Sequence, residues 1–220
     1  MSLDVIGALV LGAISTADIA VLIGLAAIRP AAKVVAFPAP VIPLLIFIIG
    51  GLVAWFAWPA FRSALLSVPL WALIGIHAFR ILGVFFLVLH RQGRLAAPFA
   101  TSAGWGDIIT GLVAIPLAVA LAWGGKVPRW LLAAWTAFGT LDLIVALTFG
   151  ALSAPGTPFR VFTEAPGTAA MGTLPWAGVP ALLVPFYLMT LLTIAVRLRT
   201  VSAKRATARG EFDNRIHSAA

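Results

Sequence analysis

The chain has 220 residues, of which 62% are hydrophobic and only 10% are charged. Soluble domains carry about 25% charged residues, so this composition excludes an ordinary water-soluble domain and predicts a membrane protein. Fifteen Lys and Arg residues against seven Asp and Glu residues give a formal net charge of +8. We interpret this excess as cations at helix ends and in one tail. The expected partner is therefore the lipid bilayer, and nucleic acid is not expected.

Cysteine is absent from the sequence, which excludes disulfides, iron–sulfur clusters, thiol catalysis and cysteine zinc sites. His77 and His90 lie in one predicted helix and His217 lies in the tail. Haem held by two histidines of one chain is therefore not expected, whereas haem on a single histidine, or a quinone, stays open as a cofactor. Metalloprotease spacing is also missing, so no metal site is predicted.

Apolar runs long enough to cross a bilayer as helix recur along the chain. They predict an all-α fold, a polytopic membrane protein built as a six-transmembrane-helix bundle. The bundle would form a single domain over residues 1–199, followed by a basic, disordered cytoplasmic tail over 200–220. Two longer connections, 91–105 and 151–174, are predicted loops. The predicted spans cover about 5–28, 40–58, 66–90, 106–123, 129–150 and 175–198.

Basic residues in the connections predict the orientation of the bundle. An even number of spans places both termini on the same side of the membrane. That side carries nine Lys and Arg residues, the opposite side carries five, and Arg80 lies within a span. We therefore predict cytoplasmic termini and a multi-pass protein of a bacterial-type inner membrane.

Five titratable residues lie within the predicted spans or at their edges: Asp18, His77, Arg80, Asp107 and Asp142. At a rise of 1.5 Å per residue, Asp18, Arg80 and Asp142 come out about 20 Å from the same membrane face. His77 lies one turn from Arg80, and Asp107 is expected to open the fourth span as an N-cap. An unpaired charge at mid-span costs about 2.5–3.5 kcal/mol. We therefore predict that Arg80 pairs with Asp18 or Asp142.

The aspartates outnumber the single arginine of this predicted site. A low-dielectric site does not tolerate the excess, so a proton, a protonated His77 or a bound cation has to compensate it. The excess shrinks by one charge if Asp107 is an exposed cap. All five titratable residues are therefore candidate ligand-binding or proton-binding residues.

Three further residues are candidates for gating or lining this site. The stretch "SAGWGDIITG", residues 102–111, reads as a loop that turns into a helix at Asp107, and Trp105 would then cover the site as a gate. In the last span, Pro180 removes one backbone hydrogen bond and could release the carbonyl of Trp176 towards the site.

The leading hypothesis is a membrane protein whose Asp/Arg/His cluster binds, or also transports, a small solute or proton. One alternative is a membrane-embedded oxidoreductase or lipid-modifying enzyme that uses His77 and an aspartate, with haem or quinone as cofactor. The other alternative is a non-catalytic subunit of a membrane complex, in which the cluster only packs helices. No catalytic residue is assigned from the sequence.

Overall fold

The computed structural model describes residues 41–173 and 175–200, which form helices and no strand. Within this part, four helices are long and apolar enough to cross a membrane. The predicted all-α membrane class is therefore confirmed at this level. The predicted span at 5–28, Asp18 and the tail from residue 201 lie outside the described residues. The four helices are Leu70–Arg91, Ala97–Ala122, Arg129–Ser153 and Val179–Thr200.

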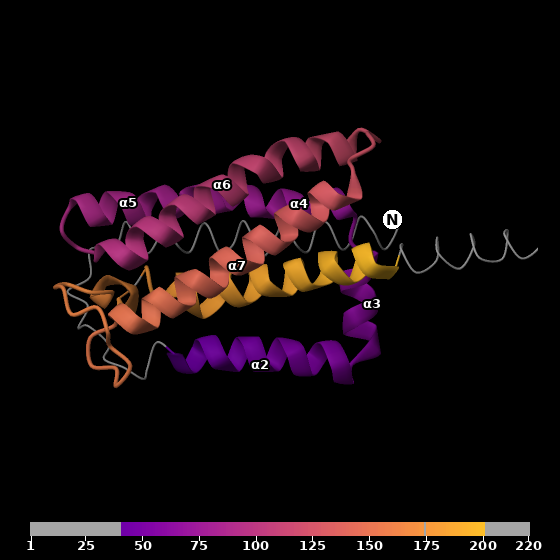
Figure 1. Cartoon of the computed structure of the whole chain (residues 1–220). Coiled ribbons are helices and arrows are strands. Elements are labelled where there is room, and N and C mark those ends of the chain that lie inside the picture. The colour runs from indigo at the N-terminus through magenta and orange to yellow at the C-terminus, as the bar shows by residue number, and fades with distance from the viewer. Residues whose placement is uncertain (1–40, 174, 201–220) are drawn as a thin grey trace, which may run out of the picture.

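The predicted span at 40–58 corresponds to a helix of 17 residues, α2 (Val41–Ala57), followed by a short helix, α3 (Pro59–Ser67). The two helices meet at an angle of 98°, and α3 crosses one end of the bundle (Figure 1). Trp58 causes the break, because a residue before proline disfavours helical angles and it adopts φ −119° and ψ 93°. Taken together, α2 and α3 would make a fifth span.

The next span is continuous but changes its winding in the middle. It comprises α4 (Leu70–Gly75), a 3₁₀ segment η1 (Ile76–Gly83) and α5 (Val84–Arg91). The span begins after Pro69, so the predicted start at residue 66 was four residues too early. A 3₁₀ run of eight residues is unusually long, since such runs rarely exceed three or four.

The following helix, α6 (Ala97–Ala122), corrects the prediction most. The segment 97–105 was expected to be a loop, and it forms the first two and a half turns of α6. The glycines of α6 are buried against neighbouring helices. Small residues at such positions let membrane helices pack closely. The connection between α5 and α6 is consequently only five residues long, residues 92–96.

Two more spans complete the described bundle. Helix α7 (Arg129–Ser153) lies against α6, and a long irregular connection that includes η2 (Ala169–Gly172) leads to the last helix, Val179–Thr200. This connection agrees with the predicted loop at 151–174. The last helix opens with a π-helical turn, η3 (Val179–Leu183), and runs alongside α7 (Figure 1).

Two apolar clusters fill the bundle, one towards each end. Along α6, the cluster nearer its start uses Phe99 and Ala103, and the cluster nearer its end uses Ala114 and Leu117. The residues between them on the same helix include Asp107 and the buried Thr110. The polar residues therefore form a layer in the middle of the bundle, with apolar packing above and below.

Candidate functional site

Arg80 is the centre of the polar layer, and its side chain is 0% exposed. Its Nε donates to Oδ1 of Asp107 at 2.6 Å, and its Nη2 donates to Oδ2 of Asp142. Its Nη1 donates to the backbone carbonyl of Gly139 at 3.2 Å, and its Cζ lies 5.7 Å from the ring centroid of Tyr187. All three guanidinium nitrogens are therefore engaged, by groups from α6 and α7, with an aromatic ring of the last helix beside them.

We call Arg80, Asp107 and Asp142 the Arg80 cluster. Of the two partners predicted for Arg80, Asp142 is confirmed, and Asp18 lies outside the described residues. Asp107 adds a second carboxylate that the prediction placed at a helix start. Because α6 begins at Ala97, Asp107 lies about 15 Å along that helix rather than at its start. Asp107 is therefore not an N-cap, and it belongs to the interior of the span.

Glycines bring the three helices of the cluster close together. A Cβ atom at Gly83 would lie 2.5 Å from the Cβ of Asp107, and one at Gly106 would overlap the carboxyl group of Asp142. A Cβ at Gly139 would lie 3.3 Å from Nη1 of Arg80. The absence of side chains at these positions is therefore what allows η1, α6 and α7 to share one guanidinium.

The 3₁₀ winding of η1 aligns the residues that line the site. In a 3₁₀ helix, residues three apart lie directly above one another, so His77, Arg80 and Gly83 form one row. All three are buried. Arg80 contacts the two aspartates, Gly83 packs against Asp107, and His77 continues the row towards the apolar cluster that contains Ile76. The winding therefore directs the polar residues of η1 to α6 and α7.

His77 is completely buried between aromatic rings of two other helices. Its ring centroid lies 5.2 Å from that of Trp135 on α7 and 5.0 Å from that of Tyr187 on the last helix. Its Nε2 lies 3.0 Å from Oγ1 of Thr190. The Trp135 indole in turn donates to the carbonyl of Thr110 at 3.1 Å, so His77 lies in a layer that ties α6, α7 and the last helix together.

The hydrogen bonds around Thr190 assign the tautomer of His77. The Thr190 hydroxyl donates its only proton to the carbonyl of Tyr187, at 2.9 Å, so its oxygen accepts from the Nε2–H of His77. Nε2 therefore carries a proton, and in the neutral ring Nδ1 is the unprotonated nitrogen. That atom and Oγ1 of Thr110 are buried and have no hydrogen-bond partner within residues 41–173 and 175–200.

The three predicted gate and lining residues do not join the cluster. Trp105 is 57% exposed and lies two helical positions from Asp107, about 200° around α6. The gate depended on a loop, and that loop is a helix. The carbonyl of Trp176 accepts from the amide of Val179 at 3.0 Å, so the release by Pro180 is not observed, and the Trp176 ring lies beside Phe85, at 6.1 Å between centroids.

Sequence reasoning missed most of the residues that support the cluster. Gly139 and Thr110 lie one turn from Asp142 and Asp107 on their helices, but spacing alone does not assign them a bond to Arg80 or to Trp135. Tyr187, Thr190 and Trp135 were not singled out at all, although Tyr187 is the chain's single tyrosine. A threonine in an apolar span carries little signal, because its hydroxyl can bond a backbone carbonyl of its own helix. An aromatic residue is equally uninformative, because such residues are common in membrane helices.

The comparisons with known proteins add a family but no activity. No curated protein and no solved structure matches the chain. Within the described residues, no group of three or more His, Cys, Asp or Glu side chains could hold a metal ion together. One family model matches residues 41–199, a range that includes the whole Arg80 cluster together with His77 and Thr190. The chain belongs to the family described as Domain of unknown function (DUF8737).

Proposed function

We propose that this protein binds a proton at the Arg80 cluster and passes it between the two sides of its membrane. The supporting observation is that one guanidinium is shared by two carboxylates in the middle of apolar spans. Among the described residues of the cluster, two negative charges face one positive charge. An uncompensated buried charge is expensive in a membrane, and a proton on one carboxyl group neutralises the site.

The tight packing of the cluster favours a proton over a larger solute. The Cβ positions of Gly83 and Gly106 are already filled by Asp107 and Asp142, so a methyl group would not fit there. A small solute would require a cavity among these side chains, whereas a proton requires only an oxygen with a lone pair. Protonation also leaves the bonds from Arg80 largely in place, since each carboxyl group has two oxygens.

The exposure of the two carboxylates suggests an order for the transfer. The Asp107 side chain is 17% exposed, that of Asp142 is 7% exposed, and that of Arg80 is 0% exposed. A proton would therefore enter at Asp107 and move to Asp142, which Arg80 holds beside it while keeping its own protons. On the other side of Arg80, Nδ1 of His77, which has no hydrogen-bond partner among the described residues, offers the next acceptor in the same row of η1.

Replacing either aspartate by asparagine tests this function. Asp107→Asn and Asp142→Asn keep the side-chain shape and leave a neutral pair with Arg80, so both variants are expected to insert and fold. Proton flux into liposomes containing the purified protein, followed with an enclosed pH-sensitive dye under an imposed pH gradient, is expected to fall about 100-fold or more in both.

The matched control is Glu164→Gln, which also converts an acid to an amide but in the exposed connection between α7 and the last helix. Its flux is expected to equal that of the unmodified protein. Equal flux in Asp142→Asn and the unmodified protein, or flux that depends on Na⁺ rather than on the pH gradient, would contradict the proposal.

The topology remains part of the proposal. We infer six spans with both termini on the cytoplasmic side of an inner membrane, with α2 as the second of them. The support is the distribution of cations, because α3 and the connection between α6 and α7 lie at the same end of the bundle as the end of the last helix (Figure 1). Helix α3 contains Arg62, and Lys126 and Arg129 lie in that connection and at the start of α7. Arg197 and Arg199, at the end of the last helix, add to this end, whereas the opposite end carries Arg91, Arg94 and Arg160.

A further inference from the structure

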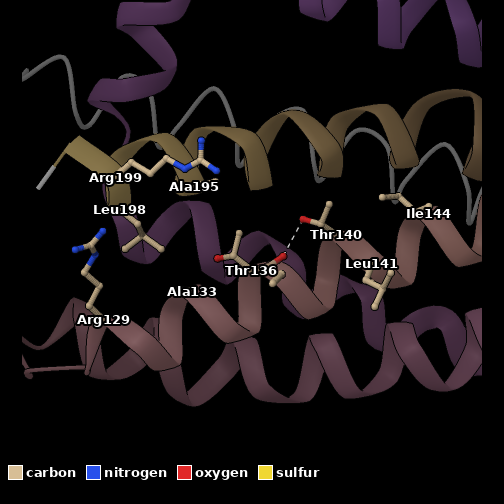
Figure 2. Close-up of a pocket in the computed structure, with 10 residues that line it drawn as sticks. Arg129, Ala133, Thr136, Thr140, Leu141, Ile144, Ala195, Leu198 and Arg199 are labelled. Carbon is tan, nitrogen blue, oxygen red and sulfur yellow. Dashed lines mark hydrogen bonds between the residues drawn. The ribbon is translucent and has the colours of Figure 1, made fainter. Parts of the chain in front are cut away.

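A groove runs along the outside of the bundle between α7 and the last helix, on a different side of α7 from the Arg80 cluster. Its volume is about 490 Å³. Figure 2 shows Arg129 and Arg199 at one end of it, with Leu198 between them, and Leu141 and Ile144 at the other end. The groove therefore has a cationic end and an apolar end. Its middle is formed by Ala133, Thr136, Ala137, Thr140 and Ala195.

The cationic end lies where the helices leave the membrane. Arg129 is the first residue of α7, and Arg199 is the second-last residue of the last helix. Both side chains are exposed. Neither forms an ion pair in the described part of the chain, where the acidic residues are Asp107, Asp142 and Glu164. Two guanidinium groups without a competing carboxylate make this end of the groove positively charged, which favours an anion.

The rest of the groove offers no polar group that needs water. The hydroxyl of Thr136 donates to the carbonyl of Leu132 at 2.7 Å, and that of Thr140 donates to the carbonyl of Thr136 at 2.8 Å. The second of these bonds is drawn in Figure 2. Both hydroxyl protons are therefore used within α7, and the surface between the arginines and Ile144 suits a hydrocarbon chain.

The length of the groove matches one leaflet of a bilayer. Arg129 and Ile144 are fifteen residues apart on α7, which corresponds to about 22 Å of helix. One leaflet contributes about 15 Å of hydrocarbon, and the head group adds several ångströms beyond it. An acyl chain lying in the groove would therefore place its head group beside the two guanidinium groups.

We propose that this groove binds one anionic phospholipid, with its phosphate at Arg129 and Arg199 and one acyl chain along Ala133, Ala137 and Leu141. The charge of the groove end selects an anionic lipid over a zwitterionic one, because a choline group would bring a third cation to the same place. Basic pockets between membrane helices recognise anionic head groups in this way. This inference does not rest on the proposed proton transfer.

Native mass spectrometry of the full chain in detergent, with added phosphatidylglycerol or phosphatidylcholine, tests the head-group end. One phosphatidylglycerol is expected to stay bound, and phosphatidylcholine is expected to bind more weakly. Arg129→Gln combined with Arg199→Gln should weaken phosphatidylglycerol binding about 30-fold, given the usual contribution of each cation near an anionic lipid. The control pair, Arg91→Gln with Arg94→Gln, removes the same charge from the opposite end and should leave binding unchanged.

A second variant tests the acyl end without changing the charge. Ala137→Trp would fill the groove and is expected to abolish retention of the lipid, whereas Ala134→Trp, at an exposed position of α7 outside the groove, should retain it. The proposal is overturned if the two lipids bind equally in the unmodified protein, or if the arginine variant retains the lipid. It is also overturned if Ala137→Trp changes the oligomeric state instead, since a second copy of the chain would then occupy the groove.

Discussion

Arg80→Gln is expected to destabilise the protein more than any other single substitution in the described spans. Arg80 is the cation shared by Asp107 and Asp142, and it also bonds the carbonyl of Gly139. Removing it leaves two carboxylates facing each other between apolar layers. Removal of one partner from a buried ion pair typically costs about 3–5 kcal/mol. The free energy of unfolding, measured by denaturant titration of the protein in mixed micelles, should fall by at least that amount.

A charge-neutral variant of the cluster distinguishes the loss of charge compensation from the loss of packing around the guanidinium. If the loss in Arg80→Gln comes from uncompensated carboxylates, the triple variant Arg80→Gln, Asp107→Asn, Asp142→Asn should recover most of the lost free energy. If the loss comes from packing around the guanidinium, the triple variant should be as unstable as the single one. An Arg80→Gln protein as stable as the unmodified protein would mean that the ion pairs contribute nothing to the fold.

Gly106→Ala is expected to have the second-largest effect, although it adds only one methyl group. The new Cβ would overlap the carboxyl group of Asp142, which bonds Arg80, and the backbone of α6 and α7 would have to separate. Overpacking of this kind costs about 1–3 kcal/mol before any loss of the ion pair is included. The same unfolding titration should therefore show a clear decrease in stability, together with reduced proton flux.

Gly50→Ala is the matched control, because nothing lies within 4 Å of the Cβ position at Gly50 in α2. A methyl group there should leave stability unchanged or raise it by up to about 1 kcal/mol, since alanine favours a helix more than glycine does. Equal effects of the two substitutions would show that α6 and α7 do not approach as closely at the cluster as described.

The sequence was sufficient to predict the helical membrane class and much of the pairing at Arg80. Hydropathy predicted a span at 129–150, and α7 covers Arg129–Ser153. The start of the helix was therefore correct, and its end lies three residues later than predicted. Counting residues from the span ends placed Arg80 and Asp142 at similar depths, and the cost of a lone buried charge then required a pair. Both arguments use properties of single segments, so they need no knowledge of the fold.

Asp107 was misplaced because the residues before it resemble a loop. The segment 97–105 contains a proline, a serine, a threonine and a glycine, which in a soluble protein would favour a turn. In a membrane the backbone has to satisfy its own hydrogen bonds, and small residues then serve close helix packing. Gly104, which reads as a helix breaker in this segment, lets α6 approach Leu87 and the backbone of Gly83, and Gly106, just after the segment, makes room for the carboxyl group of Asp142.

The 3₁₀ winding of η1 and the contact between His77 and Thr190 could not be read from the sequence. The residue types of η1 do not distinguish a 3₁₀ helix from an α-helix, because the winding depends on how Arg80 and Gly83 pack against α6 and α7. His77 and Thr190 are 113 residues apart, so their contact follows from the packing of the last helix in the bundle. Such long-range pairs depend on tertiary structure and carry no local pattern.

The central claim is that the Arg80 cluster holds a proton which it can exchange. Infrared difference spectroscopy of the reconstituted protein between high and low pH measures this most directly, because a protonated carboxyl group has its own C=O stretching band. We predict that the pH-dependent carboxyl band of the unmodified protein is kept in Glu164→Gln and loses the component of the cluster in the charge-neutral triple variant Arg80→Gln, Asp107→Asn, Asp142→Asn. The other carboxyl groups of the chain contribute equally to both spectra, so an identical band in the triple variant and the unmodified protein would contradict the claim.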